Sequence, residues 1–119
     1  MSLEWEQVVI DAADPAGLAT WWADALGWIV TVSDPDEYEI RQHPDRMPGL
    51  LFVSVSGNKT IKNRLHLDFR PDNQGSEVAR FEALGASRVD IGQGEQRWVV
   101  MADPEGNEFC VLSARPQPE

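Results

Sequence analysis

The strongest constraint on the fold is that the second half of the chain repeats the pattern of the first. The matched positions, about 57 to 59 residues apart, are Gln7 and His66, residues 25–27 (ALG) and 83–85 (ALG), and residues 49–52 (GLLF) and 106–109 (GNEF). Each half reads as a strand, a helix and then three strands. The pattern predicts an α+β fold of two tandem βαβββ modules within one domain, residues 1–119. Module 1 spans about 5–56 and module 2 about 63–113; chance similarity between two amphipathic halves is the alternative.

Local signals place the elements inside each half. Asp14 is a good N-cap for a helix over residues 15–26, Pro15 suits its first position, and Gly27 is typical of a helix C-terminus. The stripe Val78, Phe81 and Leu84 predicts a second helix, ending at Gly85 after a turn at 71–75. Strands are expected at 5–12, 28–32, 38–42 and 50–55, and at 64–70, 87–91, 97–102 and 108–112.

The expected strand over residues 64–70 carries the candidate functional side chains. Its alternation predicts Leu65, Leu67 and Phe69 on one face. Arg64, His66 and Asp68 then project together from the other face. A basic group, an imidazole and a carboxylate at alternate positions can line a polar cleft.

Charge and cysteine content exclude several classes of protein. Twenty acidic residues against ten basic ones give a formal net charge of -10, which repels a nucleic-acid backbone and favours cationic ligands. The single cysteine, Cys110, allows no intrachain disulfide. No apolar run approaches the roughly 20 residues of a membrane helix, and the N-terminus lacks the pattern of a signal peptide. A cytoplasmic protein that does not bind nucleic acid or membranes is expected.

Four motifs give the chain a family resemblance. They are residues 8–15 (VVIDAADP), 22–28 (WADALGW), 62–68 (KNRLHLD) and 102–109 (ADPEGNEF). With the doubled βαβββ unit, they resemble the vicinal oxygen chelate superfamily, which includes glyoxalase I, bleomycin-resistance proteins and extradiol dioxygenases. The chain is most similar to its glyoxalase-like domain proteins. The resemblance implies an open, curved mixed sheet around a concave ligand cleft, and a homodimer.

Catalytic relatives hold a divalent metal at four positions, which correspond here to Gln7, Val53, His66 and Cys110. Val53 cannot coordinate a metal, and Cys110 replaces the usual carboxylate. The two-histidine, one-carboxylate pattern of iron enzymes is absent. The resemblance therefore implies a degenerate site and no metal cofactor. Zinc, which accepts His66 and Cys110, is the divalent ion left open, with Glu108 on the same face as an alternative carboxylate.

Several side chains remain open to two interpretations. His66 either holds its strand by a hydrogen bond or contacts a ligand and carries protons. Asp68 either orients His66 or is a solvated residue, and Arg64 either pairs with Asp68 or Glu108 or binds a substrate carboxylate.

Apolar side chains carry a similar ambiguity. Cys110 is expected to be a buried core thiol. Trp21 and Trp22 are expected to pack the first helix. Trp98 either belongs to the core or stacks on a flat ligand in the cleft.

Three functions compete. The first is binding of a small organic molecule by Gln7, Arg64, His66, Trp98, Glu108 and Cys110, without chemistry. The second is a lyase, isomerase or dioxygenase type of enzyme that uses His66 with Asp68 or Glu108 for proton transfer. The third is an interaction module with a vestigial cleft. The acidic composition and the degenerate metal positions favour the first.

Overall fold

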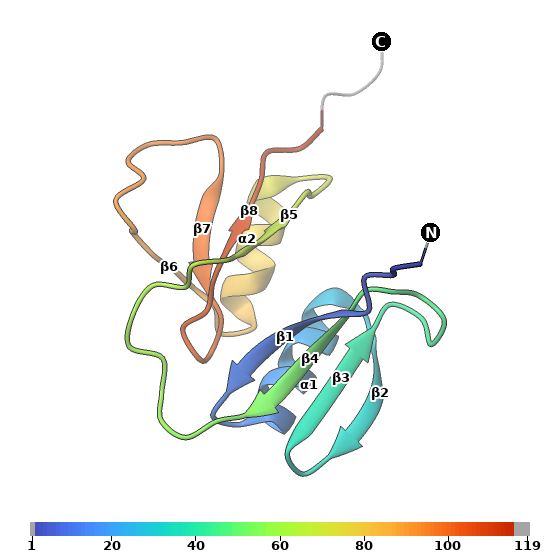
Figure 1. The fold of residues 1–119 in the computed structure, drawn as a ribbon. Helices are drawn as coiled ribbons and strands as arrows, with labels where there is room; N and C mark the ends of the chain where they lie inside the picture. Colours follow the sequence, from blue (N-terminus) through green and yellow to red (C-terminus); the bar gives the residue numbers. More distant parts are fainter. Residues whose placement is uncertain (1, 116–119) are drawn as a thin grey trace. The chain divides into compact units, whose positions relative to one another are not determined.

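In the computed structural model, which describes residues 2–115, the chain forms two compact units, residues 1–58 and 59–119, and each unit carries one βαβββ module (Figure 1). Unit 1 contains β1 (Gln7–Ala12), α1 (Pro15–Leu26), β2 (Ile29–Asp34), β3 (Glu37–Arg41) and β4 (Gly49–Ser54). Unit 2 contains β5 (Leu67–Phe69), α2 (Gln74–Ala83), β6 (Ser87–Arg88), β7 (Val99–Ala102) and β8 (Glu108–Val111). The predicted α+β class and the tandem repeat are confirmed.

Each unit folds its four strands into one mixed sheet with the same topology. The strand order is β1-β4-β3-β2 in unit 1 and β5-β8-β7-β6 in unit 2. In both, the first strand pairs in parallel with the last, and the other pairings are antiparallel. The parallel pairing needs a crossover connection, which the helix and the two intervening strands supply.

The first helix has the termini that the sequence predicted. Asp14 caps it, with its side chain accepting a hydrogen bond from the amide of Gly17 at 3.1 Å, and Pro15 follows. Gly27 closes the helix in the left-handed conformation, at φ 69°. Trp22 is buried and meets Trp21 edge-on, with ring centroids 4.9 Å apart, so the predicted helix packing of these tryptophans is confirmed.

The core of each unit lies between the helix and one face of the sheet. In unit 1, Trp22 of α1 is buried together with Ile40 and Phe52 of the sheet. In unit 2, Phe81 of α2 packs on Phe109 of β8 with ring centroids 4.8 Å apart, and Phe69 of β5 contacts both rings. The opposite face of each sheet is therefore the face without a helix.

The strand predicted over residues 64–70 is shorter than expected. Only Leu67–Phe69 pairs with β8, and Leu65, which was predicted to lie on the buried face, is 84% exposed. The physical reason is that the preceding segment bonds to side chains rather than to a strand, since the amide of Asn63 donates to the Glu108 carboxylate at 3.2 Å. Periodicity alone cannot reveal that competition.

The next two elements, α2 and β6, also differ from the prediction. The strand expected over residues 87–91 reduces to β6, because the amide of Ile91 donates to Gln93 Oε1 and that of Gly92 to Asp90 Oδ1, which makes a turn. The second helix begins inside the predicted turn, where Asn73 acts as N-cap by accepting from the Ser76 amide at 2.9 Å. Within residues 2–115, neither helix combines the length and apolarity that crossing a bilayer requires.

Candidate functional site

The helix-free face of unit 2 brings Asp68 and Cys110 together. These residues are partners in the parallel β5–β8 register, so their side chains leave the sheet on the same side. Their neighbours Phe69 and Phe109 point to the other side, where they contact Phe81 of the helix. Strand alternation thus separates a polar pair from the aromatic core.

His66 completes a cluster with this pair. Its Nε2 lies 3.1 Å from Asp68 Oδ1, and the donor atoms of His66, Asp68 and Cys110 all lie within 4.8 Å of one another. Cys110 is only 4% exposed, whereas the side chains of His66 and Asp68 are 41% and 49% exposed. The structure therefore places an imidazole and a carboxylate at the surface, beside a buried sulfur. The prediction that Cys110 is buried is confirmed.

The Cys110 thiol is held in its protonated form. Burial raises its pKa to about 11, and the negative charge of Asp68 and a hydrogen bond to that carboxylate act in the same direction. The Lys62 ammonium opposes them by lowering the pKa. Because the thiolate is the nucleophilic form, Cys110 in this state is a poor nucleophile at neutral pH.

Glu108 has partners of its own. Its carboxylate accepts from Lys59 Nζ at 2.8 Å and from the Asn63 amide at 3.2 Å. Burial would raise the pKa of Glu108, but these hydrogen bonds outweigh it and hold the pKa below its usual value. Glu108 is therefore ionised and fastens the 59–63 segment to β8. No local pattern predicted this contact, since Lys59 lies 49 residues away in the chain.

Arg64 and Trp98 lie at the surface, outside the strands. In the described part of the chain, Asp68 pairs with His66 and Glu108 pairs with Lys59, and no ion pair joins Arg64 to either carboxylate, which was one of the two roles left open for it. Trp98 precedes β7 and is 38% exposed, so part of its ring is open to solvent. Contact of either residue with a ligand stays a prediction.

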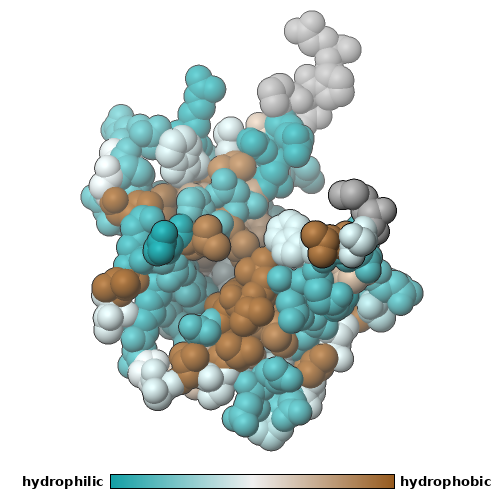
Figure 2. All heavy atoms as spheres, viewed as in Figure 1, coloured by the Kyte–Doolittle hydropathy of each residue, from teal (hydrophilic) through white to brown (hydrophobic). Residues whose placement is uncertain are grey.

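Gln7 begins the first strand of unit 1, on the helix-free face. Gln7, Val9 and Asp11 alternate along β1, and their parallel partners on β4 are Gly49, Leu51 and Val53. Val9 is 54% exposed, and Figure 2 shows apolar side chains gathered over β1 and β4. Unit 1 thus presents an open, partly apolar sheet surface.

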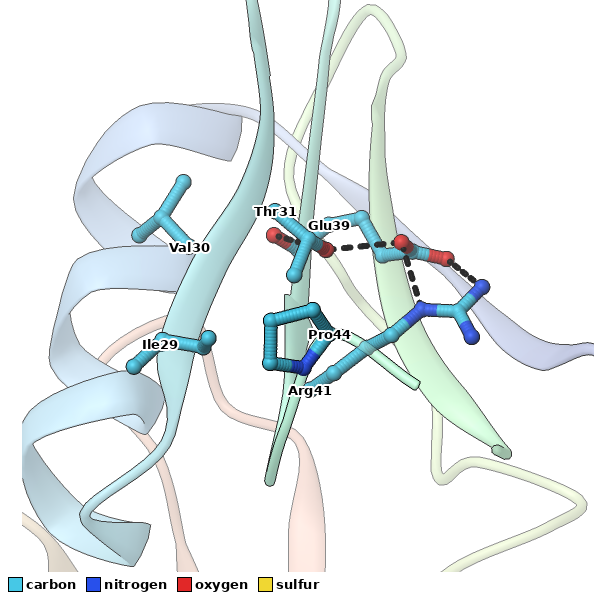
Figure 3. A pocket seen from close by; sticks show the side chains of 6 residues that line it. All are labelled: Ile29, Val30, Thr31, Glu39, Arg41 and Pro44. Carbon is cyan, nitrogen blue, oxygen red and sulfur yellow. Dashed lines mark hydrogen bonds and ion pairs between the residues drawn. The ribbon is translucent and has the colours of Figure 1, made fainter. Parts of the chain in front are cut away.

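An ion-pair network that sequence reasoning missed lies on the same face. Arg41 donates from Nε to Glu39 Oε1 at 2.8 Å and from Nη2 to Glu39 Oε2 at 3.0 Å (Figure 3). The hydroxyl of Thr31 also donates to Glu39 Oε1, at 2.7 Å. Glu6 accepts a further bond from Arg41. The signal was available, because residues two apart on a strand share a face.

These charges are buried beside a hollow. Glu39 is 5% and Arg41 8% exposed, and the hydrogen bond from Arg41 holds the pKa of Glu39 below its usual value. A depression of about 500 Å³ adjoins them. It is lined by Ile29, Val30, Thr31, Glu39, Arg41 and Pro44 (Figure 3). Buried charges that are fully paired are suited to orient a polar ligand group at the edge of an apolar surface.

The residues at the metal positions that the family resemblance implies do not fit a hard divalent metal. Val53 has no donor atom, and Cys110 offers sulfur in place of the carboxylate. Hard cations such as Mg²⁺ take oxygen ligands, and the iron enzymes use two histidines and a carboxylate. The donors that unit 2 does bring together, His66, Asp68 and Cys110, form a different set.

The doubled βαβββ architecture, with one open sheet face in each unit, defines a class of small α+β proteins. A family model described as a glyoxalase-like domain matches residues 7–112, and the chain therefore belongs to that family. No match was found among curated proteins.

Solved structures with the same fold include enzymes and binding proteins. A glyoxalase/bleomycin resistance protein/dioxygenase family enzyme from Burkholderia phytofirmans is 17% identical, with a TM-score of 0.68; the match covers 92% of this chain and 98% of that one. Glyoxalase I from Leishmania major, which is trypanothione-dependent, is 14% identical, with a TM-score of 0.67 and coverage of 94% and 87%.

A third similar structure is the bleomycin-binding protein from Streptomyces verticillus, complexed with copper(II)-bleomycin. It is 15% identical, with a TM-score of 0.62 and coverage of 97% and 99%. At these identities the likeness shows the fold, and the function has to be argued from the residues of this chain.

Proposed function

We propose that this protein binds a small, positively charged organic molecule on the helix-free face of its sheets. The observation that carries the proposal is the surface of unit 1, where Val9 is 54% exposed beside the half-buried Leu51 and Val53. A sheet face that remains apolar and uncovered favours a ligand surface over a solvated one.

The charge of the protein favours a positively charged ligand. The net charge of -10 attracts cations, and Asp11 adds a carboxylate to the apolar surface. The bleomycin-binding relative is a protein of the same fold whose ligand is known, and bleomycin is therefore a reasonable first probe.

The test is a calorimetric titration of the protein with metal-free bleomycin in the presence of a chelator. Val9→Lys places a cation on the proposed surface, at a site exposed enough to tolerate it, and should weaken binding about 10-fold, which corresponds to about 1.4 kcal/mol. Leu3→Lys, at an exposed position outside the sheets, is the matched control and should bind as the unmodified protein does.

A wider screen covers the case in which bleomycin is not the ligand. Methyl resonances of Val9, Leu51 and Val53 should shift on addition of at least one compound from a library of small cations. If no cation shifts these methyl groups, the proposal fails.

A second candidate, proton transfer by His66, is supported by one contact. The 3.1 Å separation between its Nε2 and Asp68 Oδ1 resembles a base held by a carboxylate, and leaves Nδ1 to face a substrate. Glu108 is a weaker partner than expected, because Lys59 and Asn63 already occupy its carboxylate. Exchange of deuterium into carbon acids beside a carbonyl, followed by NMR, would detect this activity, and His66→Gln should abolish it.

A further inference from the structure

We propose that His66, Asp68 and Cys110 bind one thiophilic divalent cation, of the Zn²⁺ type, using ligands from unit 2 alone. The site would share His66 and Cys110 with the metal positions that the family resemblance implies, but it would take Asp68 as its third ligand and would need nothing from Gln7 or Val53. It goes beyond the proposed function and does not depend on it.

The donor spacing suits a small tetrahedral ion. Ligand atoms bound to tetrahedral zinc lie roughly 3.3 to 3.6 Å apart, given bond lengths of about 2.0 to 2.3 Å. His66 Nε2 and Asp68 Oδ1 are already 3.1 Å apart, and all three donor atoms lie within 4.8 Å. The three donor atoms would need to move together by about 1 Å to bind one ion.

The backbone fixes two donors and leaves the third adjustable. Asp68 and Cys110 are paired across β5 and β8, so their separation is set by the ladder. His66 precedes β5 and its side chain is 41% exposed, so its ring can turn towards an ion. A site with three protein ligands keeps a fourth position for water or a ligand atom.

The chemical types of the donors select the ion. Sulfur, imidazole nitrogen and carboxylate oxygen together favour zinc and its soft relatives over Mg²⁺ or Ca²⁺, which take oxygen ligands. As the only cysteine of the chain, Cys110 also has no disulfide partner within it. The Cys110 sulfur is buried, but the imidazole of His66 and the carboxylate of Asp68 beside it are accessible. A metal ion could therefore reach the sulfur from the side on which these two groups lie.

Lys62 is the local group that opposes a cation. Its ammonium lies close enough to lower the pKa of the Cys110 thiol, and its Nζ donates to the Asn63 carbonyl at 3.3 Å. Because this side chain is exposed, it can be changed with little effect on folding. Lys62→Gln should therefore tighten metal binding, an effect that a merely structural cluster would not produce.

The test uses the full chain, freed of metal with a chelator and then titrated with Co²⁺ and Zn²⁺. One equivalent of Co²⁺ should give a thiolate-to-cobalt charge-transfer band in the near ultraviolet and strong tetrahedral bands in the visible, and Zn²⁺ should displace it. With only one cysteine in the chain, the band reports Cys110.

Matched variants separate the ligands. Cys110→Ser should abolish the band, and Asp68→Asn should lower Zn²⁺ affinity by more than the 10- to 100-fold typical of an outer-shell partner. His43→Gln, in the other histidine of the chain, should leave affinity unchanged. Circular dichroism checks the fold of each variant, and Asp68→Asn, at an exposed position, keeps the test valid if Cys110→Ser unfolds.

An octahedral Co²⁺ spectrum without a thiolate band would overturn the inference, as would unchanged affinity in Asp68→Asn. A stoichiometry of one ion per two chains would also overturn it, because the ligands would then come from two molecules. The bleomycin titration is made with chelator present, so its failure and the failure of the metal site are distinguishable.

Discussion

Asp68 of β5 lies directly opposite Cys110 of β8, and a ligand atom of its carboxylate lies within 4.8 Å of the Cys110 sulfur. The pairing links an exposed charge to a buried sulfur across two strands that are 42 positions apart in the sequence. Burial contributes most to the raised pKa of the thiol, and the negative charge of Asp68 acts in the same direction, because both disfavour the thiolate.

The reactivity of Cys110 should follow from this pairing. At pH 8 a thiol of pKa about 11 holds on the order of 100-fold less thiolate than an ordinary cysteine, so alkylation by iodoacetamide should be slower by at least that factor than in urea. Asp68→Asn removes the charge and should speed the reaction, whereas Asp72→Asn, an exposed position beyond β5, should not. Mass spectrometry measures the rates of alkylation. Equal rates in the native protein and in urea would contradict a raised pKa of the Cys110 thiol.

His66 should matter to binding more than to stability. Its side chain is 41% exposed, so His66→Ala removes little buried surface and should leave the melting temperature within a few degrees. Affinity for Zn²⁺ should fall, because the imidazole is one of the three proposed ligands. Thermal unfolding and calorimetry measure the two effects, with His43→Ala as control. A large loss of stability with unchanged affinity would make His66 a structural residue.

Glu39 should make the protein sensitive to acid. Its pKa is held below the usual 4.5 by Arg41, so the stability it contributes is fully present above pH 4.5 and is lost as the pH falls through the lower folded pKa. Glu39→Gln should flatten the decline of the unfolding free energy in that window. Glu37→Gln, exposed on the same strand, is the control, and urea titrations between pH 3 and 7 measure the difference. An unchanged slope in Glu39→Gln would argue against the ion pair.

Glu108 should hold the 59–63 segment against β8. Removing its carboxylate in Glu108→Ala ends the bonds to Lys59 and to the Asn63 amide. Exchange of that amide should accelerate about 10-fold, as expected for the loss of about 1.5 kcal/mol of charge-assisted hydrogen bonding. Trypsin should also cut faster after Lys59 and Lys62. Glu95→Ala, in an exposed loop of the same unit, should change neither measurement, and unaltered exchange in Glu108→Ala would show that other contacts hold the segment.

The sequence alone determined the architecture because its signals are local and occur twice. Asp14, Pro15 and Gly27 fixed the ends of the first helix, and the repeated strand–helix–three-strand order gave the tandem modules. Membership of the glyoxalase-like family was also readable, and the match over residues 7–112 confirms it. The homodimer and the cytoplasmic location stay predictions.

Which polar groups meet depends on how distant segments pack in the folded chain. Strand alternation correctly placed His66 and Asp68 on one side, but it predicted a buried Leu65, which is exposed because the segment before β5 bonds to Glu108. The pairing of Asp68 with Cys110, of Glu108 with Lys59 and of Glu39 with Arg41 depends on which strands become neighbours or on where side chains find partners. Periodicity specifies the face on which a side chain lies, whereas its partner is set by the packing of segments distant in sequence.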